Sequence, residues 1–444
     1  MSLRGYRHEW LLLCLIALAS LPLVSVTGAQ DTSRLALTES IVHRGSVDID
    51  PYWELTTDRA FAHGHWYTDK APGVSLLAVV PVAVANLVAP GTMKSGPSWT
   101  HGWLLWMIRI WTGGIAYLAL VFLAGRIAEG VREGAGAVVA VTLGLGTMIG
   151  SLGPTMFGHV PDALLLLGAF LLATRARQAR DWIWVGVLAG FGVLFEYPAA
   201  IAVLLLVVFA LRKGGRAAAG ATILGGVPAA AILGTYDQLA FGAPWRLSYR
   251  YTDNVFTAHQ HEGLFGIGVP TANGVWTLLI DGHGLLLVSP VLIAATAGLI
   301  AWGRTHRLEA GIAGGIAFAF ALATIGYFLP NGGLSPGPRF ATAAIPFLLL
   351  GLAVALERSP WVTTALAALS IGVGMFDELT WSIANRLEFL GWPKTTWSML
   401  GLSPRLGCIC LLTAATGAAL LAGASLFRSG LLSTSRRSAT VNAA

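Results

Sequence analysis

Two charged side chains near the start of the chain could do chemistry at a membrane surface. Asp31 directly follows the first long apolar run, at or just before a helix predicted over residues 33–44, which Gly45 should end. An aspartate there is an ordinary N-cap, but it could also be a carboxylate aimed at a substrate's reacting group. Lys70 precedes the next apolar run. It could bind a lipid phosphate with help from the helix dipole, or snorkel as interfacial lysines do.

The elements that hold these residues must be membrane helices. Of the 444 residues, 55% are hydrophobic and only 11% are charged, against about 25% charged in an average soluble protein. Such a composition excludes a soluble globular or disordered chain, and continuous rather than alternating apolar runs exclude a β-barrel. The three cysteines lie inside apolar runs and form neither a disulfide framework nor a zinc site. The net charge of +6 comes from short clusters between the runs, which are topology signals and not a nucleic-acid patch.

The apolar runs predict an all-α polytopic membrane protein with about twelve transmembrane helices and both termini inside. The first span could instead be a cleavable signal peptide, but an uncleaved anchor is favoured because the run is long and a multi-span body follows. The predicted spans are 10–28, 103–124, 135–152, 162–174, 182–196, 197–211, 217–241, 284–302, 310–329, 339–356, 361–376 and 405–427.

The run over 72–90 decides the orientation. If it crosses the membrane, the basic clusters of the later loops all lie outside, against the positive-inside rule. If it dips in and returns, those clusters are cytoplasmic. We therefore predict a juxtamembrane or re-entrant helix there, broken by Pro81.

The remaining residues form one membrane domain with long segments on the outer face. These segments are 29–102, a possible lid over 242–283, and 377–404, whereas residues 428–444 form a short cytoplasmic tail. We therefore expect function on the outer, extracytoplasmic face of the cell (inner) membrane.

Other outer-face residues are candidates for a site. His159 and Asp162 are three apart, hence on one face of a helix, although Asp162 could simply cap it. Arg339 lies outside against the positive-inside trend, so it should pair with an anion, either a phosphate or an outer carboxylate. A His-x-His-Glu run over 259–262 hints at metal but is more typical of a polar loop.

Two motifs in the first outer segment resemble the GT-C membrane glycosyltransferases. The resemblance is to the branch with protein O-mannosyltransferases, the aminoarabinose transferase of lipid A and the Rgt-type enzymes. It rests on Asp31, on the run Ser-Arg-x-Ala-Leu-Thr-Glu over 33–39, and on Tyr-Thr-Asp-Lys-Ala-Pro-Gly over 67–73. Such enzymes carry juxtamembrane helices in the first outer loop.

The resemblance implies a reaction and roles. A sugar would move from a polyprenyl-phosphate donor to a lipid, glycan or protein acceptor, with inversion, and Asp31 would be the general base. The donor phosphate would be bound by Lys70, Arg34 and Arg339. Four further residues would line the site: Tyr67, Asp69, His159 and Asp162.

The chain departs from the motifs at Thr32, where many members carry a second acid, and at Ala71, which replaces a proline. A single carboxylate is a poor site for Mg²⁺ or Mn²⁺, so a divalent metal is possible but not supported, and no cofactor is expected.

Two other classes of function remain open. A transporter or lipid flippase also fits about twelve spans, but it usually shows internal repeats and midplane charges, and this chain shows no repeat. A non-catalytic relative of the glycosyltransferases is the third possibility.

Overall fold

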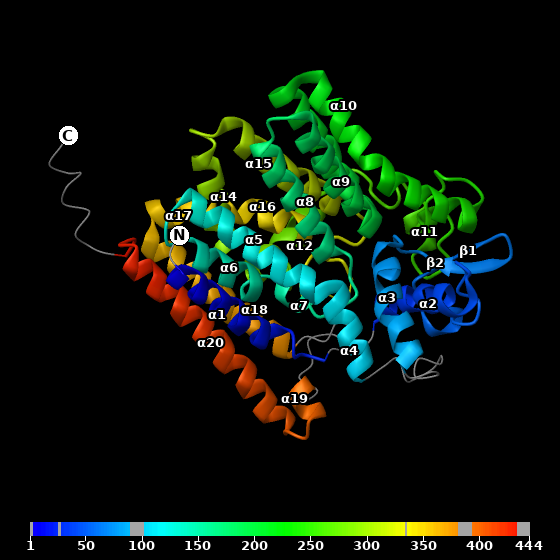
Figure 1. Ribbon diagram of the computed structural model, residues 1–444, viewed down its shortest axis with the longest axis horizontal. Coiled ribbons are helices and arrows are strands. Elements are labelled where there is room, and N and C mark those ends of the chain that lie inside the picture. The colour runs from blue at the N-terminus through cyan, green and yellow to red at the C-terminus, as the bar shows by residue number, and fades with distance from the viewer. Residues whose placement is uncertain (1–2, 25–27, 89–101, 334, 381–392, 433–444) are drawn as a thin grey trace.

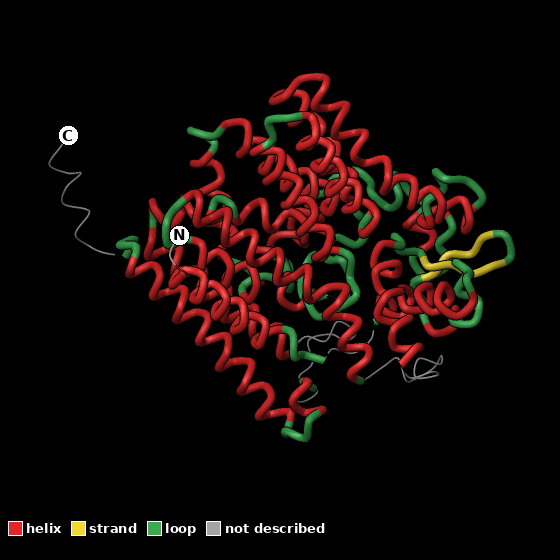
Figure 2. The backbone as a smooth tube through the Cα atoms, viewed as in Figure 1, coloured by secondary structure: helices red, strands yellow, loops and turns green. Residues whose placement is uncertain are grey.

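The protein is almost wholly helical, with one small hairpin at its edge (Figures 1 and 2). The computed structural model describes residues 3–24, 28–88, 102–333, 335–380 and 393–432. Part of the predicted outer segment 377–404 and most of the predicted tail 428–444 lie outside these described residues.

The predicted apolar runs fold as helices, which confirms the all-α polytopic fold. Their bounds are α1 Leu3–Ser20, α4 Trp103–Arg109, α5 Ile115–Val131, α6 Gly136–Leu145, α8 His159–Arg175, α9 Ala179–Phe195, α10 Ala200–Phe241, α14 Val291–Trp302, α15 Arg307–Gly326, α16 Ile345–Leu349, α17 Leu352–Arg358, α18 Pro360–Thr380 and α20 Pro404–Arg428. A π-helical turn, η3 (Ile110–Gly114), joins α4 to α5, and a 3₁₀ helix, η6 (Arg339–Ala344), precedes α16.

Five helical stretches among the described residues are long and apolar enough to cross a membrane, and a bent pair over 339–358 makes a sixth. The other predicted spans are shorter apolar helices. The predicted pair 197–211 and 217–241 is one long helix, α10, interrupted at Gly215, whose φ of 75° lies outside the helical region. The break falls in the basic cluster that the sequence predicts to be a loop.

The first outer segment contains two helices, α2 (Ala29–Arg44) and α3 (Gly73–Val88), which pack on each other. Helix α2 begins earlier than predicted. Gly28 is its N-cap and Asp31 lies in its first turn, so the capping prediction for Asp31 is wrong. The predicted stop at Gly45 is confirmed, since Gly45 has a left-handed conformation (φ 63°) that closes the helix.

The predicted break of the second helix at Pro81 is also wrong, because α3 continues through the proline. Proline has no N–H to donate to the carbonyl four residues earlier, here that of Leu77. The indole N–H of Trp111 donates to this carbonyl instead, at 3.1 Å. The helix therefore continues with its freed carbonyl satisfied by a neighbouring element.

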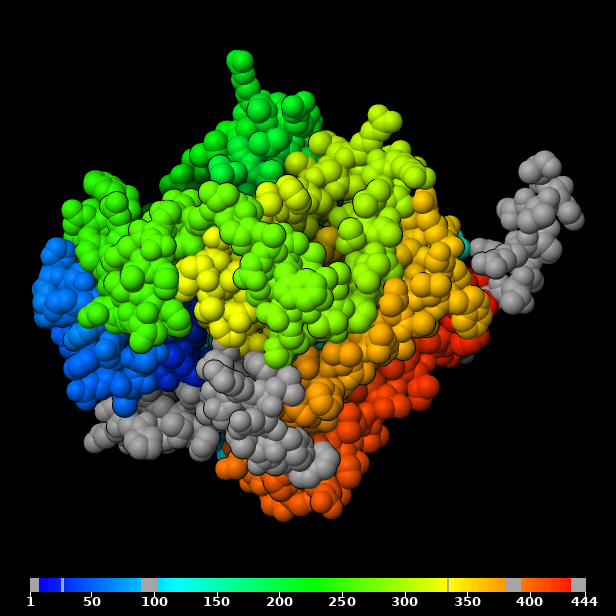
Figure 3. Space-filling view, turned by 180° about the vertical axis from the view of Figure 1, so that it is seen from behind, coloured from blue at the N-terminus to red at the C-terminus, as the bar shows by residue number. Residues whose placement is uncertain are grey.

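Between α2 and α3 lies the hairpin of β1 (Arg59–Ala62) and β2 (His65–Thr68), turned at His63 and Gly64, both with positive φ. A bridge from Ala60 to Thr252 ties the hairpin to the segment 242–283. Figure 3 shows this light-green segment beside the blue first outer segment. The remaining short elements are η1 (Trp53–Leu55), α7 (Ile149–Leu152), η4 (Tyr197–Ala199), η5 (Ser248–Arg250), α11 (Thr257–Gln260), α12 (Ala272–Leu279), α13 (Leu285–Val288) and α19 (Thr396–Met399).

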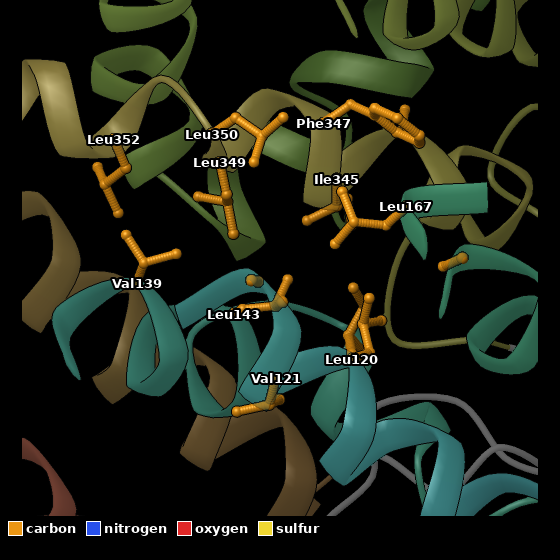
Figure 4. Packing of buried hydrophobic residues seen from close by; sticks show 14 of the residues in the cluster. Leu120, Val121, Val139, Leu143, Leu167, Ile345, Phe347, Leu349, Leu350 and Leu352 are labelled. Carbon is orange, nitrogen blue, oxygen red and sulfur yellow. The ribbon is translucent and has the colours of Figure 1, made fainter. Parts of the chain in front are cut away.

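Two apolar cores hold these elements together. The larger one lies within the bundle, where side chains of α5, α6, α8 and residues 345–352 point toward one another (Figure 4). The smaller one joins α2, the hairpin, α3, α4 and the end of α10. The start of α3 approaches the end of α9 closely, because a Cβ on Gly73 would lie 2.5 Å from the carbonyl oxygen of Leu194.

This close approach makes a prediction for Gly73→Ala. The added methyl group has no room, so the variant should lose about 1–3 kcal/mol of stability, as overpacked sites do. Thermal unfolding in detergent measures the loss. The control is Gly130→Ala in α5, where the exposed position has open space for a Cβ. Equal unfolding midpoints for the two variants would contradict the packing described here.

Candidate functional site

Asp31 is buried and held by two partners. The guanidinium of Arg109 donates to Oδ2 at 2.5 Å, and the backbone N–H of Met156 donates to Oδ1 at 3.1 Å. The two side chains are 3% and 2% exposed, so the ion pair is closed off from water. A buried charge needs such pairing, because an isolated one would be too costly to bury.

The sequence analysis missed Arg109 because it stands inside an apolar run. A charged residue inside a predicted membrane span is itself a sign of function, and this sign could have identified Arg109 as a candidate. The π-helical turn η3 directly follows it, and such turns are frequent at functional sites. Gly113 in this turn packs on the chain over 153–155, where a Cβ would lie 2.4 Å from the carbonyl oxygen of Thr155. Arg109 and Met156 are thereby brought to the same carboxylate.

Arg34 lies one turn after Asp31 on the same face of α2 and is fully buried. It donates to Gln30 Oε1 at 2.6 Å and to Glu196 Oε1 at 3.0 Å. The same Glu196 oxygen lies 3.6 Å from Nδ1 of His159. Glu196 therefore links the first outer segment to the helix that begins at His159, and it was not among the predicted site residues.

Glycine makes this link possible. Gly158 is the N-cap of α8, and a Cβ there would lie 2.4 Å from the carbonyl oxygen of Phe195 and 2.6 Å from Oε1 of Glu196. Because the glycine has no side chain, the start of α8 can approach the end of α9 closely. His159 and Glu196 are consequently neighbours.

Lys70 lies between two carboxylates, with its Nζ 3.1 Å from Oδ2 of Asp58 and 3.1 Å from Oδ2 of Asp69. Burial favours the neutral amine, but the two carboxylates outweigh burial and raise the pKa of Lys70 above its ordinary value. For Asp69, burial dominates and raises the pKa to about 6. Asp58 is a second partner that the sequence analysis missed.

Arg339 faces the same group of charges. Gly332, with a φ of 77°, allows the preceding loop to turn beside it, where a Cβ would lie 2.8 Å from Cγ of Arg339. The guanidinium lies over the rings of Phe157 and Phe340, at 5.5 and 5.2 Å from their centroids. No acidic side chain within the described part of the chain pairs with it. The positive charges of Arg339 and Arg34 also lower the pKa of Lys70, but by less than burial does.

The structure thus brings together five of the predicted site residues, from four separate parts of the chain. They are Arg34, Asp69, Lys70, His159 and Arg339. Asp31 adjoins them through Arg34. Asp162 is buried one turn into α8, and its Oδ1 faces Gly192 of α9 without a hydrogen-bond partner among the described residues. Tyr67 lies elsewhere, with its ring edge-on to Phe241 at 5.4 Å in the smaller apolar core.

The described residues contain no group of three or more His, Cys, Asp or Glu side chains placed to hold a metal ion. In the His-x-His-Glu run, the ring of His259 stacks on Phe328 at 5.4 Å.

Comparison with known proteins gives matches in structure alone. No family model and no curated protein sequence matches the chain. Among solved structures, ArnT from Cupriavidus metallidurans bound to undecaprenyl phosphate has a TM-score of 0.57 at 13% identity, covering 97% of this chain and 78% of that one. The oligosaccharyltransferase of Archaeoglobus fulgidus, in complex with Zn and sulfate, has a TM-score of 0.54 at 16% identity, covering 86% of this chain and 53% of that one.

The chain has the GT-C fold. This is the fold that the resemblance seen in the sequence implies, and together with the apolar helices it makes the chain an integral membrane protein. The chain spans about half the length of the oligosaccharyltransferase that it matches.

The buried ion pair makes a prediction about stability. Arg109→Met should cost about 3–5 kcal/mol, because it leaves the Asp31 carboxylate buried and unpaired. Adding Asp31→Asn should restore part of this loss, since the amide carries no charge. A double-mutant cycle, followed by unfolding in detergent, measures the coupling.

The control for this cycle is Arg44→Met. Arg44 pairs with Asp48 at 2.7 Å, but its side chain is 36% exposed, so the expected cost is below about 1 kcal/mol. If the double variant unfolds as easily as Arg109→Met alone, the pair does not carry the stability assigned to it.

Proposed function

We propose that this protein is a membrane glycosyltransferase of the GT-C type, which moves a sugar from a polyprenyl-phosphate donor to an acceptor on the extracytoplasmic face of the cell membrane. One observation supports it most. Lys70 and Arg34 of the first outer segment and Arg339, far along the chain, lie close enough for their charges to act on one another, next to the buried Asp31. The likeness to ArnT, solved with undecaprenyl phosphate, supports a lipid-phosphate donor.

The cations would bind the donor phosphate. When the bond between the sugar and the phosphate oxygen breaks, the leaving lipid phosphate gains one negative charge. Lys70 and Arg34 already have carboxylate partners, whereas Arg339 pairs with none among the described residues. The planar guanidinium of Arg339 can therefore donate hydrogen bonds to two phosphate oxygens at once.

Asp31 would act as the general base. A carboxylate has about four lone-pair directions, and Arg109 and Met156 use one on each oxygen. The remaining directions can accept the proton of an acceptor hydroxyl. The hydroxyl oxygen then attacks the anomeric carbon from the side opposite the phosphate, which inverts that centre as the carbon–oxygen bond to phosphate breaks.

The segment 242–283 would cover the donor site. Ser248 donates to the backbone carbonyl of Asp69 at 2.8 Å, directly beside Lys70. Further along the same segment, the backbone of Ile267 forms a β-bridge with Tyr327, whose ring packs on Phe340. The segment thus contacts the chain beside Lys70 directly, and it reaches Phe340, the neighbour of Arg339, through Tyr327, as expected for a lid. The sugar can be a hexose or a pentose, and the acceptor a lipid, a glycan or a protein.

The role of Asp31 is tested by Asp31→Asn. Loss of a general base typically lowers the rate by about 10²–10⁴-fold. The rate is expressed per folded molecule, because Asp31→Asn also removes the carboxylate partner of the buried Arg109. The assay follows sugar transfer from radiolabelled polyprenyl-phosphate sugars to membrane fractions. Mass spectrometry of cell-envelope glycans, with and without the gene, first identifies the product.

The matched control is Asp50→Asn. Asp50 lies in the same outer segment but pairs with the exposed His65, at 2.6 Å. If Asp31→Asn transferred sugar at the wild-type rate, Asp31 would not be the general base. Movement of substrate across vesicles without a covalent product would instead establish a transporter.

Protonation of Asp69 gives a pH prediction. Burial raises its pKa to about 6, so it becomes mostly neutral as the pH falls from 7.5 to 5.5. Lys70 then keeps only Asp58 as a charged partner, and binding of a singly charged phosphodiester should tighten by about three- to fivefold. Calorimetry with a short-chain prenyl phosphodiester measures this change. The Asp69→Asn variant should bind tightly at both pH values, and an unchanged pH slope in it would exclude Asp69 as the titrating group.

A further inference from the structure

A second site lies at the other end of the bundle. A cavity of about 340 Å³ is formed by α1, α5, α6 and α20, which pack side by side (Figure 1). It lies near the start of α1 and the end of α5, whereas Asp31 follows the end of α1 and Arg109 precedes the start of α5. The positive-inside rule assigns this end to the cytoplasm. Ligand pockets typically measure about 300–1,000 Å³, so the cavity is large enough for a small ligand or a lipid head group.

The floor of the cavity is a tight turn that fixes a carboxylate. Glu129 accepts hydrogen bonds from the backbone N–H groups of Gly134, at 3.0 and 3.1 Å, and of Gly136, at 2.9 Å. A Cβ on Gly136 would lie 2.8 Å from Oε2 of Glu129. Ser425 of α20 donates to the carbonyl of Gly134 at 3.1 Å, so α20 is seated on this turn. The floor is therefore a built feature and not a loose surface.

The rim carries charges of both signs. Arg126 pairs with Glu9 at 2.7 Å, and Glu133 and Arg428 are exposed beside the cavity. Within the described residues, no acidic side chain pairs with Arg428. A simple anion would be repelled by the carboxylates, and a simple cation by the arginines. A ligand that carries both charges a few bonds apart would satisfy both.

The walls are apolar and open onto the outside of the bundle. Leu12, Leu13 and Leu421 line the cavity. Phe122 lines it as well and stacks on Trp10, which is 62% exposed. Tryptophan at such a position is typical of a membrane interface. An acyl chain could therefore run along the wall into the surrounding lipid.

We propose that this cavity binds the head group of a zwitterionic phospholipid with a primary amine, that is, phosphatidylethanolamine. Arg428 binds the phosphate, and the carboxylates of Glu129 and Glu133 bind the ammonium group, which donates three hydrogen bonds. The glycerol and the first carbons of the chains contact the leucine wall. The site is separate from the proposed donor site and does not depend on the proposed reaction.

Native mass spectrometry tests this proposal with the full-length protein. The protein is incubated with equal amounts of phosphatidylethanolamine, phosphatidylcholine and phosphatidylglycerol, and the retained lipid is counted. Phosphatidylethanolamine should be retained most, because phosphatidylcholine lacks ammonium donors and phosphatidylglycerol lacks the amine. Arg428→Glu should lower its retention about fivefold.

The matched control is Arg304→Glu. Arg304 is exposed on the same predicted face but does not line the cavity, so the same charge change there should leave retention unaltered. Ala137→Phe, which fills the cavity wall, should lower retention while the unfolding midpoint stays near that of the wild type. Equal retention of the three lipids, a preference for phosphatidylglycerol, or equal effects of the two arginine variants would overturn the proposal.

Discussion

The arrangement of the site depends on one constraint, which is that a charge removed from water must meet an opposite charge or a hydrogen-bond partner. The pair of Asp31 and Arg109 satisfies it most completely, since both side chains are almost wholly buried. Their pairing joins α2, which lies outside the main bundle, to α4 at its edge. The first outer segment is thus held on the bundle by an ion pair as well as by apolar contact.

The same constraint organises the remaining charges. Three of the four cations pair with the four acids, Arg109 with Asp31, Arg34 with Glu196, and Lys70 with Asp58 and Asp69, whereas Arg339 lies over aromatic rings. Burial raises the pKa of Asp69 to about 6, so part of this acid is protonated near neutral pH. A place where cations slightly prevail over acids is suited to an anionic ligand, which supports the proposed phosphate site.

Sequence patterns predicted the parts of the site that are local. The helices follow from apolar runs, and Asp31, Arg34 and Lys70 follow from two motifs within one outer segment. The acids Asp58 and Glu196 and the cation Arg109 were missed, because their roles exist only through tertiary contacts with residues far away in the chain. Tyr67 illustrates the converse. It stands in the same motif as Asp69, but it lies at the buried end of β2 and packs into the smaller core.

The bond from Trp111 to the carbonyl of Leu77 has a mechanical consequence. A proline usually makes a helix compliant, since one rung of its hydrogen-bond ladder is absent. In α3 the missing rung is replaced from η3, an element rooted in the bundle. The hydrogen bond that stabilises α3 at Pro81 therefore comes from a neighbouring element and not from α3 itself. Bending α3 there would strain η3 as well, and η3 directly follows the arginine that holds Asp31.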